Sequence, residues 1–110
     1  GGAAKYLAHG EQRALEIAIA LVGDPDLLLL DEPTAGMGPE ETKATVALIE
    51  RLATERTILL VEHKMKMILG LSDRILVLHH GRLIADGTPQ DIQSNAEVRR
   101  VYLGQSQGYA

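Results

Sequence analysis

Two adjacent carboxylates, Asp31 and Glu32, are the residues of this sequence best suited to chemistry. They follow four consecutive leucines at 27–30, a run too short for an independent helix, which we expect to form a strand buried on both faces. In open α/β sheets, ligands bind at the carboxyl ends of strands, where several loops converge. Because side chains alternate along a strand, one acid could hold a metal ion and the other a water molecule. Taken alone, the pair fits the solvated start of a loop about equally well.

A histidine follows the second apolar strand that the sequence predicts. Pro39 opens a helix in the preferred first position, and the run at 57–61 that comes after it is again apolar throughout. Strand, helix and strand in this order form a right-handed parallel crossover. A lone histidine after a strand is more often structural than catalytic. Here, however, we expect His63 to share one sheet edge with Asp31 and Glu32, which favours a functional role.

A further helix is predicted near the start of the chain. Its apolar residues fall on one stripe, which consists of Leu15, Ala18, Ile19 and Val22. Gly10, just before the helix, could let backbone N–H groups approach a phosphate, which a helix N-terminus also favours. The alternative is that Gly10 simply begins the helix, and this segment alone favours that interpretation.

The second half of the chain predicts smaller elements. We expect a short helix around Ile68, then a hairpin whose turn is His80-Gly81. His79 and His80 are interpreted as exposed polar residues without chemistry. The segment 88–91 resembles a capping box that starts a helix. A last helix is expected over about 95–103, with its inward side made of Val98, Val101 and Tyr102.

Composition limits the class of protein. A chain of 110 residues is the size of one small domain, and 45% hydrophobic residues suffice for a core. The net charge of -4 argues against a nucleic-acid binder, and the lack of cysteine excludes disulfides and thiolate metal sites. No apolar run approaches the roughly 20 residues that span a bilayer, and no signal peptide is recognisable. We expect one soluble, cytoplasmic domain over 1–110, with 1–4 a tag remnant or frayed end.

Four motifs, in order, resemble those of the ATPase subunits of ABC transporters. They are Leu-Ala-His-Gly-Glu-Gln at 7–12 for the signature, Leu-Leu-Leu-Leu-Asp-Glu-Pro at 27–33 for Walker B, Ala-Gly-Met-Gly at 35–38 for the D-loop, and Val-Glu-His at 61–63 for the switch histidine. The resemblance covers about residues 5–104. Within the family, the D-loop, the Val-Glu-His-x-Met segment and the Val-Tyr-Leu-Gly ending at 101–104 are most similar to branched-chain amino acid importers, with urea importers close by.

The resemblance implies a partial P-loop NTPase fold of the α/β class. Parallel strands with flanking helices would be followed by a hairpin and C-terminal helices. The 110 residues contain no Gly-rich P-loop with its Lys and Ser/Thr, no strand leading into it and no glutamine loop, all of which lie upstream in complete subunits. We therefore expect a C-terminal fragment that is inactive alone, binds Mg·ATP weakly and self-associates through unpaired strand edges.

The resemblance also implies roles for individual residues. Asp31 would hold Mg²⁺ through water, Glu32 would polarise the attacking water, and His63 would contact the γ-phosphate of ATP. Further nucleotide contacts would come from the signature and the D-loop, namely from Ala8, His9, Gly10, Glu11, Gly36 and Gly38. The chain departs from the usual family residues at four positions, with Ala8 for Ser, His9 for Gly, Gly38 for Asp and Lys64 for Asp.

The function implied is that of the ATP-hydrolysing subunit of an importer, most similar to those for branched-chain amino acids. Its signature would cap ATP on a second ATPase subunit in a head-to-tail dimer, and permease subunits would hold the pair at the cytoplasmic face of the inner membrane. Two alternatives remain open. One is a non-catalytic regulatory or interaction module, and the other is an ABC ATPase of translation or DNA repair.

Overall fold

A computed structural model of the chain describes residues 9–104, so the expected tag remnant or frayed end at 1–4 lies outside the described residues. The elements in chain order are α1 (His9–Leu21), β1 (Leu27–Asp31), α2 (Pro39–Leu52), β2 (Thr57–Val61), α3 (Met65–Leu71), β3 (Ile75–His79), β4 (Arg82–Gly87), α4 (Pro89–Ser94), α5 (Ala96–Val98) and the π-helix η2 (Arg99–Leu103). They form two compact units, which divide between Glu62 and His63. The expectation of a single domain stays a prediction. Between residues 9 and 104, no helix combines the length and the apolar character needed to cross a membrane.

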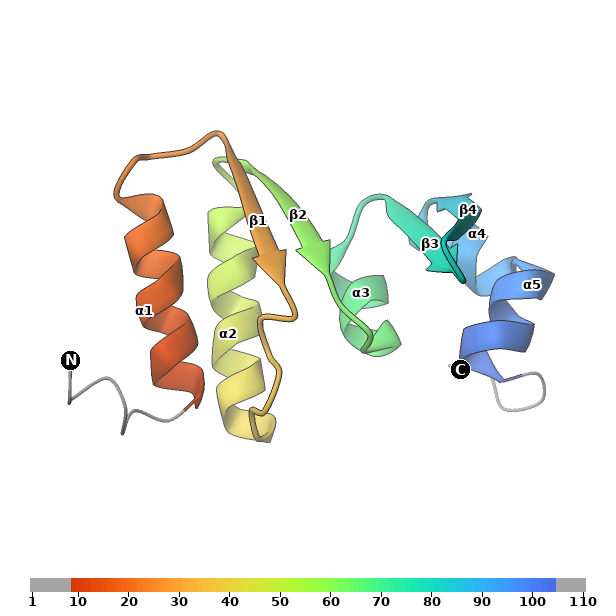
Figure 1. Cartoon of the computed structure of the whole chain (residues 1–110), viewed down its shortest axis with the longest axis horizontal. Coiled ribbons are helices and arrows are strands. Elements are labelled where there is room, and N and C mark those ends of the chain that lie inside the picture. The colour runs from red at the N-terminus through yellow and green to blue at the C-terminus, as the bar shows by residue number, and fades with distance from the viewer. Residues whose placement is uncertain (1–8, 105–110) are drawn as a thin grey trace. The chain divides into compact units, whose positions relative to one another are not determined.

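The first unit is built on the parallel pair β1 and β2. The strands pair in register from Leu27 opposite Thr57 to Asp31 opposite Val61, which confirms the predicted parallel crossover. α1 and α2 run in the opposite direction to the strands (Figure 1). The helix N-termini and the strand carboxyl ends therefore lie toward the same end of this unit, the arrangement that concentrates polar loops there.

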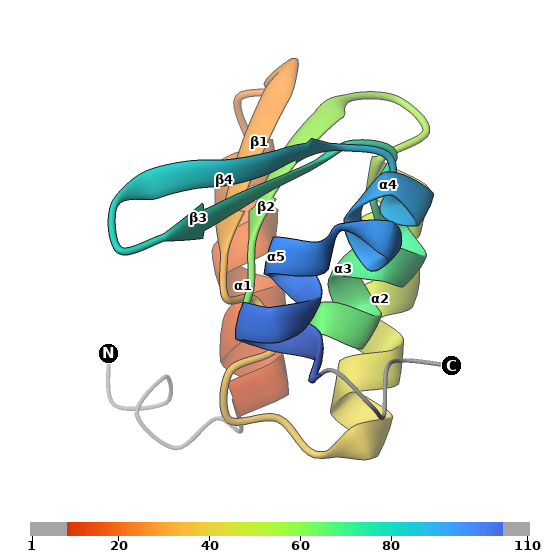
Figure 2. The same ribbon diagram turned by 90° about the vertical axis from the view of Figure 1, so that its right-hand side faces the viewer.

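Only one face of the β1–β2 sheet is covered, so the expectation of a strand buried on both faces is wrong. Leu28 and Leu30 are 4% and 7% exposed, whereas Leu29 and Leu59 on the other face are 61% and 53% exposed. α1 and α2 contact each other, and both lie on one side of the pair (Figures 1 and 2). The alternation of side chains along a strand then leaves every second leucine uncovered.

The predicted stripe of α1 is also not its buried face. Ile17 is the buried residue of this helix, at 5% exposure, whereas Ile19 and Val22 of the stripe are 64% and 85% exposed. A helix turns by about 100° per residue, which places position 17 on the side opposite the stripe. In α2, by contrast, Thr45 and Ile49 are buried.

The second unit contains the predicted hairpin. β3 and β4 are antiparallel, with His79 opposite Arg82, and the turn residues His80 and Gly81 both have positive φ, at 49° and 75°. Such turns match the twist of the paired strands. Figure 2 shows the turn at one end of the hairpin and α4 following its other end. The hairpin packs on the helices through a buried cluster of Ile75, Val77, Ile92, Val98 and Leu103.

The C-terminal helices begin as the sequence predicts but end differently. The hydroxyl of Thr88 accepts a hydrogen bond from the amide of Asp91, whose carboxylate accepts one from the amide of Thr88, which confirms the capping box. The last helix changes into the π-helix η2, and Leu103 rather than Tyr102 is buried, at 4% against 39% exposure. A π turn closes hydrogen bonds to the fifth residue and so rotates later side chains away from the α-helical register. The hydroxyl of Tyr102 instead donates to the carbonyl of Leu78 at 2.6 Å.

Truncation of Ile92 tests the core of the second unit. Because Ile92 is 1% exposed, Ile92→Ala should lower the free energy of unfolding by about 2–5 kcal/mol. Leu83, at 53% exposure in the same unit, provides the control, and Leu83→Ala should cost less than about 1 kcal/mol. Urea denaturation followed by circular dichroism measures both, and equal losses would contradict the core described above.

Acid should weaken the hairpin through Asp86. Arg74 donates two hydrogen bonds to this carboxylate, at 2.8 and 2.7 Å, and these bonds lower the pKa of Asp86. A carboxylate whose pKa is lower in the folded state stabilises the fold above its unfolded pKa of about 3.9, and this contribution is lost as the pH falls through the folded value. Asp86→Asn should therefore lower Tm at neutral pH but not at about pH 2. The exposed Asp73→Asn serves as control, and a Tm difference independent of pH would refute the assignment.

Candidate functional site

The acidic pair lies at the carboxyl end of β1, as predicted. Asp31 is the last residue of the strand and is exposed, whereas Glu32 follows it and is half-buried. Glu32 has a φ of 46°, in the left-handed region that residues other than glycine rarely adopt and that costs about 1–3 kcal/mol. The chain therefore turns sharply away from the strand at the second carboxylate.

Three backbone hydrogen bonds hold this turn. The amide of Glu32 donates to the carbonyl of Val61 at 2.7 Å, the amide of Ala35 donates to the carbonyl of Glu32 at 3.1 Å, and the amide of Met37 donates to the carbonyl of Thr34 at 3.1 Å. The first of these bonds extends the β1–β2 pairing one residue beyond the strand. Together they offset the unfavourable conformation of Glu32 and fix its position relative to β2.

The segment expected to be the D-loop follows directly. Gly36 has a φ of 76°, a conformation that strongly favours glycine, whereas Gly38 has a φ of -77° and open space around it as the N-cap of α2. Between them, the sulfur of Met37 accepts a hydrogen bond from the hydroxyl of Thr45 at 3.3 Å, and Thr45 is buried in α2. The loop is thus anchored to the helix behind it, and only Gly36 of the two glycines is required by its backbone conformation.

The predicted signature lies at the start of α1. The helix begins at His9, so Gly10 lies within its first turn rather than before it, and Glu11 is an exposed acid of that turn. Ala8 lies outside the described residues. The N-terminus of α1 lies toward the same end of the first unit as the carboxyl end of β1 (Figure 1), where Asp31 is the last residue.

The predicted switch histidine belongs to the second unit. His63 is its first residue and is exposed, and Lys64 after it is the N-cap of α3, where its side chain makes no capping hydrogen bond. A cation is mildly unfavourable at this end of a helix. The shared edge of His63 with Asp31 and Glu32 stays a prediction.

Sequence reasoning overlooked one pair of residues at this site. Thr34 is fully buried, and its hydroxyl donates a hydrogen bond to Oε2 of Glu62 at 3.2 Å. Glu62 follows β2 directly, and it therefore occupies the kind of strand-end position that drew attention to Asp31. The same rule of strand ends could have identified Glu62, but the contact with Thr34, 28 residues earlier, depends on the strand register.

The donor groups at the end of β1 suit Mg²⁺. Within residues 9–104, no three His, Asp or Glu side chains gather into a site that could hold a metal by themselves. Mg²⁺ does not need such a cluster, because it is commonly bound by one or two carboxylates together with waters and substrate phosphates. The exposed carboxylate of Asp31 can provide that contact.

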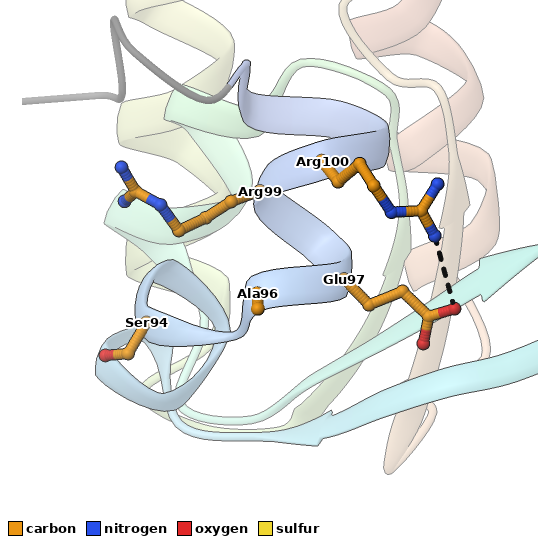
Figure 3. A pocket seen from close by; sticks show the side chains of 5 residues that line it. All are labelled: Ser94, Ala96, Glu97, Arg99 and Arg100. Atoms are coloured by element: carbon orange, nitrogen blue, oxygen red, sulfur yellow. Dashed lines mark ion pairs between the residues drawn. The ribbon is translucent and has the colours of Figure 1, made fainter.

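A separate hollow lies on the helices of the second unit. It is lined by Ser94, Ala96, Glu97, Arg99 and Arg100 (Figure 3). Arg100 forms an ion pair with Glu97 at 3.7 Å, and Arg99 donates to the carbonyl of Gln93. Both guanidinium groups thus interact with neighbours on their own segment, and none of the predicted site residues lines this hollow.

Known protein families match both ends of the chain. The ABC transporter family matches residues 2–35, and the family described as branched-chain amino acid ATP-binding cassette transporter matches residues 82–106. The high-affinity branched-chain amino acid transport ATP-binding protein LivG of Escherichia coli (strain K12) is 50% identical over 105 residues. The corresponding protein BraF of Pseudomonas aeruginosa is 47% identical over 102 residues. These alignments cover 94% and 91% of this chain but 41% and 40% of the relatives, so the chain spans about two fifths of their length.

Solved structures of ATP-binding cassettes of ABC transporters also resemble this chain. A nucleotide-free ATP-binding cassette from an ABC transporter has a TM-score of 0.78 at 28% identity, covering 91% of this chain and 42% of its own. The ADP conformation of an ATP-binding cassette of an ABC transporter has a TM-score of 0.76 at 28% identity, covering 91% and 41%. Both confirm the α/β ABC ATPase fold class predicted from the motifs. Half of the residues aligned with LivG are identical, and over most of its length the chain is therefore similar to the ATP-binding subunits of ABC transporters for branched-chain amino acids.

Proposed function

We propose that this chain forms part of the ATP-hydrolysing subunit of an ABC importer and that the imported solute is a branched-chain amino acid. The observation that carries the proposal is the acidic turn after β1, where Glu32 is held at positive φ next to Asp31 and is bonded to the end of β2. Such backbone strain concentrates at functional positions. The similarity to LivG and BraF, whose names state branched-chain amino acid transport, supports the solute class.

The two acids have different tasks in this proposal. Asp31, with its exposed carboxylate, would hold Mg²⁺. The half-buried Glu32 accepts a hydrogen bond from a water molecule and directs that water toward the γ-phosphate of ATP. Mg·ATP supplies the phosphoryl group and the positive charge that balances its oxygens. His63 donates a hydrogen bond to the γ-phosphate, so that its position depends on whether that phosphate is present.

The signature and the D-loop contact a second ATPase subunit and the ATP that it holds. In a head-to-tail dimer, the N-terminus of α1, with His9, Gly10 and Glu11, faces the ATP held by the partner, since a helix N-terminus favours an anion. Gly36 and Gly38 lie at the same interface, where the anchored loop limits the approach of the partner. Ala8 takes part at the edge of the signature without the hydroxyl of the usual Ser. Permease subunits hold the dimer at the cytoplasmic face of the membrane.

Substitution of Glu32 tests the proposed hydrolysis. In a complete cassette, obtained by joining this chain to the N-terminal part of LivG, Glu32→Gln should reduce ATP turnover about a hundredfold or more while ATP binding is retained. The amide keeps the shape and the hydrogen bonding of the carboxylate but cannot polarise the water as strongly. Glu50→Gln, on the exposed side of α2, is the matched control and should leave turnover unchanged. An undiminished rate in Glu32→Gln would assign the water to another residue.

The 110-residue chain by itself should bind Mg·ATP with a Kd of about 1 mM or weaker. Its sequence contains no Gly-rich loop followed by Lys and Ser/Thr, so the β- and γ-phosphates lack the backbone amides and the cation that normally hold them. Isothermal titration calorimetry of the chain with Mg·ATP measures this, with the complete cassette as the control. A micromolar Kd for the chain alone would contradict the assignment of its motifs.

A further inference from the structure

We infer that Glu62 is a positioning residue for ATP hydrolysis, which it supports by fixing, through Thr34, the turn that carries Glu32. This inference rests on the proposed function. The hydroxyl of Thr34 donates to Oε2 of Glu62 at 3.2 Å, and the Thr34 side chain is completely buried. Thr34 lies two residues after Glu32, and Glu62 directly precedes His63. One side-chain contact therefore ties the turn that carries Glu32 to the residue that follows β2.

The contact supplements a backbone bond at the same place. The amide of Glu32 donates to the carbonyl of Val61, the neighbour of Glu62, at 2.7 Å. The backbone bond is available to any residue at position 62, whereas the bond from Thr34 requires an oxygen there. Two attachments, which lie two residues apart on the turn and on the consecutive residues Val61 and Glu62, prevent the turn from rotating about either one. Burial makes the second attachment valuable, because hydrogen bonds of buried polar groups are costly to lose.

The conformation of Glu32 explains why such an attachment matters. A residue at a φ of 46° stays there only when its surroundings determine its conformation fully. If the turn loosens, Glu32 can relax to negative φ, and its carboxylate then points elsewhere. A displacement of about 1 Å in a positioning group can reduce a rate about a hundredfold. The loss should appear in kcat, because neither Thr34 nor Glu62 is proposed to contact the nucleotide.

The bond length fits this role. At 3.2 Å it is long for a hydrogen bond between two oxygens. Hydrogen bonds of catalytic sites are often long without substrate and shorten in the reactive complex.

An alternative role for Glu62 is direct reaction with water as a second base. The two roles differ in what glutamine can replace, because its side-chain oxygen can accept from Thr34 but cannot take up a proton.

Four single variants and one double variant of the complete cassette separate these roles. Glu62→Ala and Thr34→Val remove the hydrogen bond and should lower kcat about ten- to hundredfold, with KM for ATP changed less than about threefold. Glu62→Gln and Thr34→Ser preserve the bond and should stay within about threefold of the wild type. The double variant Glu62→Ala/Thr34→Val should have a kcat no lower than that of the less active single variant, since both substitutions remove the same interaction. The exposed Glu50→Ala is the control for loss of a carboxylate.

Amide hydrogen exchange of the 110-residue chain provides a readout that does not involve ATP. In Glu62→Ala and Thr34→Val, the amides of Ala35 and Met37 should exchange at least about tenfold faster than in the wild type, and in the two conservative variants they should not. Unchanged exchange, or unchanged kcat, in the two disruptive variants overturns the inference. Glu62→Gln as inactive as Glu62→Ala also overturns it, in favour of a base. A wild-type cassette without ATP hydrolysis would instead refute the proposed function, whatever the exchange rates.

Discussion

The in-register parallel pairing of β1 with β2 is the constraint on which the first unit depends. Because Asp31 lies opposite Val61, both strands end at the same level, and the residues that follow them meet. The bond from the amide of Glu32 to Val61 and the contact of Thr34 with Glu62 are both consequences of that register. A slip by one residue would separate these partners and would also turn Leu28 and Leu30 away from the helices. The geometry of the acidic turn is thus determined by the sheet more than by the loop itself.

Several elements could be predicted from the sequence because each has a strong local cause. Pro39 has its φ preset and needs no amide partner, so it begins α2 as expected. His80-Gly81 supplies a two-residue turn, and Thr88 with Asp91 supplies reciprocal caps. The same holds for the position of the acidic pair, because an apolar run bounded by polar residues locates the end of a strand. The roles of Asp31, Glu32 and His63 came from the family resemblance, and those roles stay predictions.

Other features could not be predicted because they depend on what packs nearby. A continuous run of leucines looks the same whether one face of its strand or both are covered. The sequence therefore could not predict that Leu29 is exposed. The burial of Leu103 in place of Tyr102 follows from a π turn, which a search for a period of 3.6 does not detect. The bond between Thr34 and Glu62 joins residues far apart in sequence, so only the pairing of the strands reveals it.

The positive φ of Glu32 sets stability against activity at that single position. Glycine adopts this backbone conformation without steric cost, so selection for a stable turn alone would favour glycine there by about 1 kcal/mol or more. The carboxylate is thus retained at a standing energetic disadvantage, which the rest of the turn has to offset. Mutations that stabilise the fold elsewhere would make this residue easier to keep, whereas destabilising ones would raise the advantage of losing it. The conformation of one residue thereby connects the mutational tolerance of the whole unit to its chemistry.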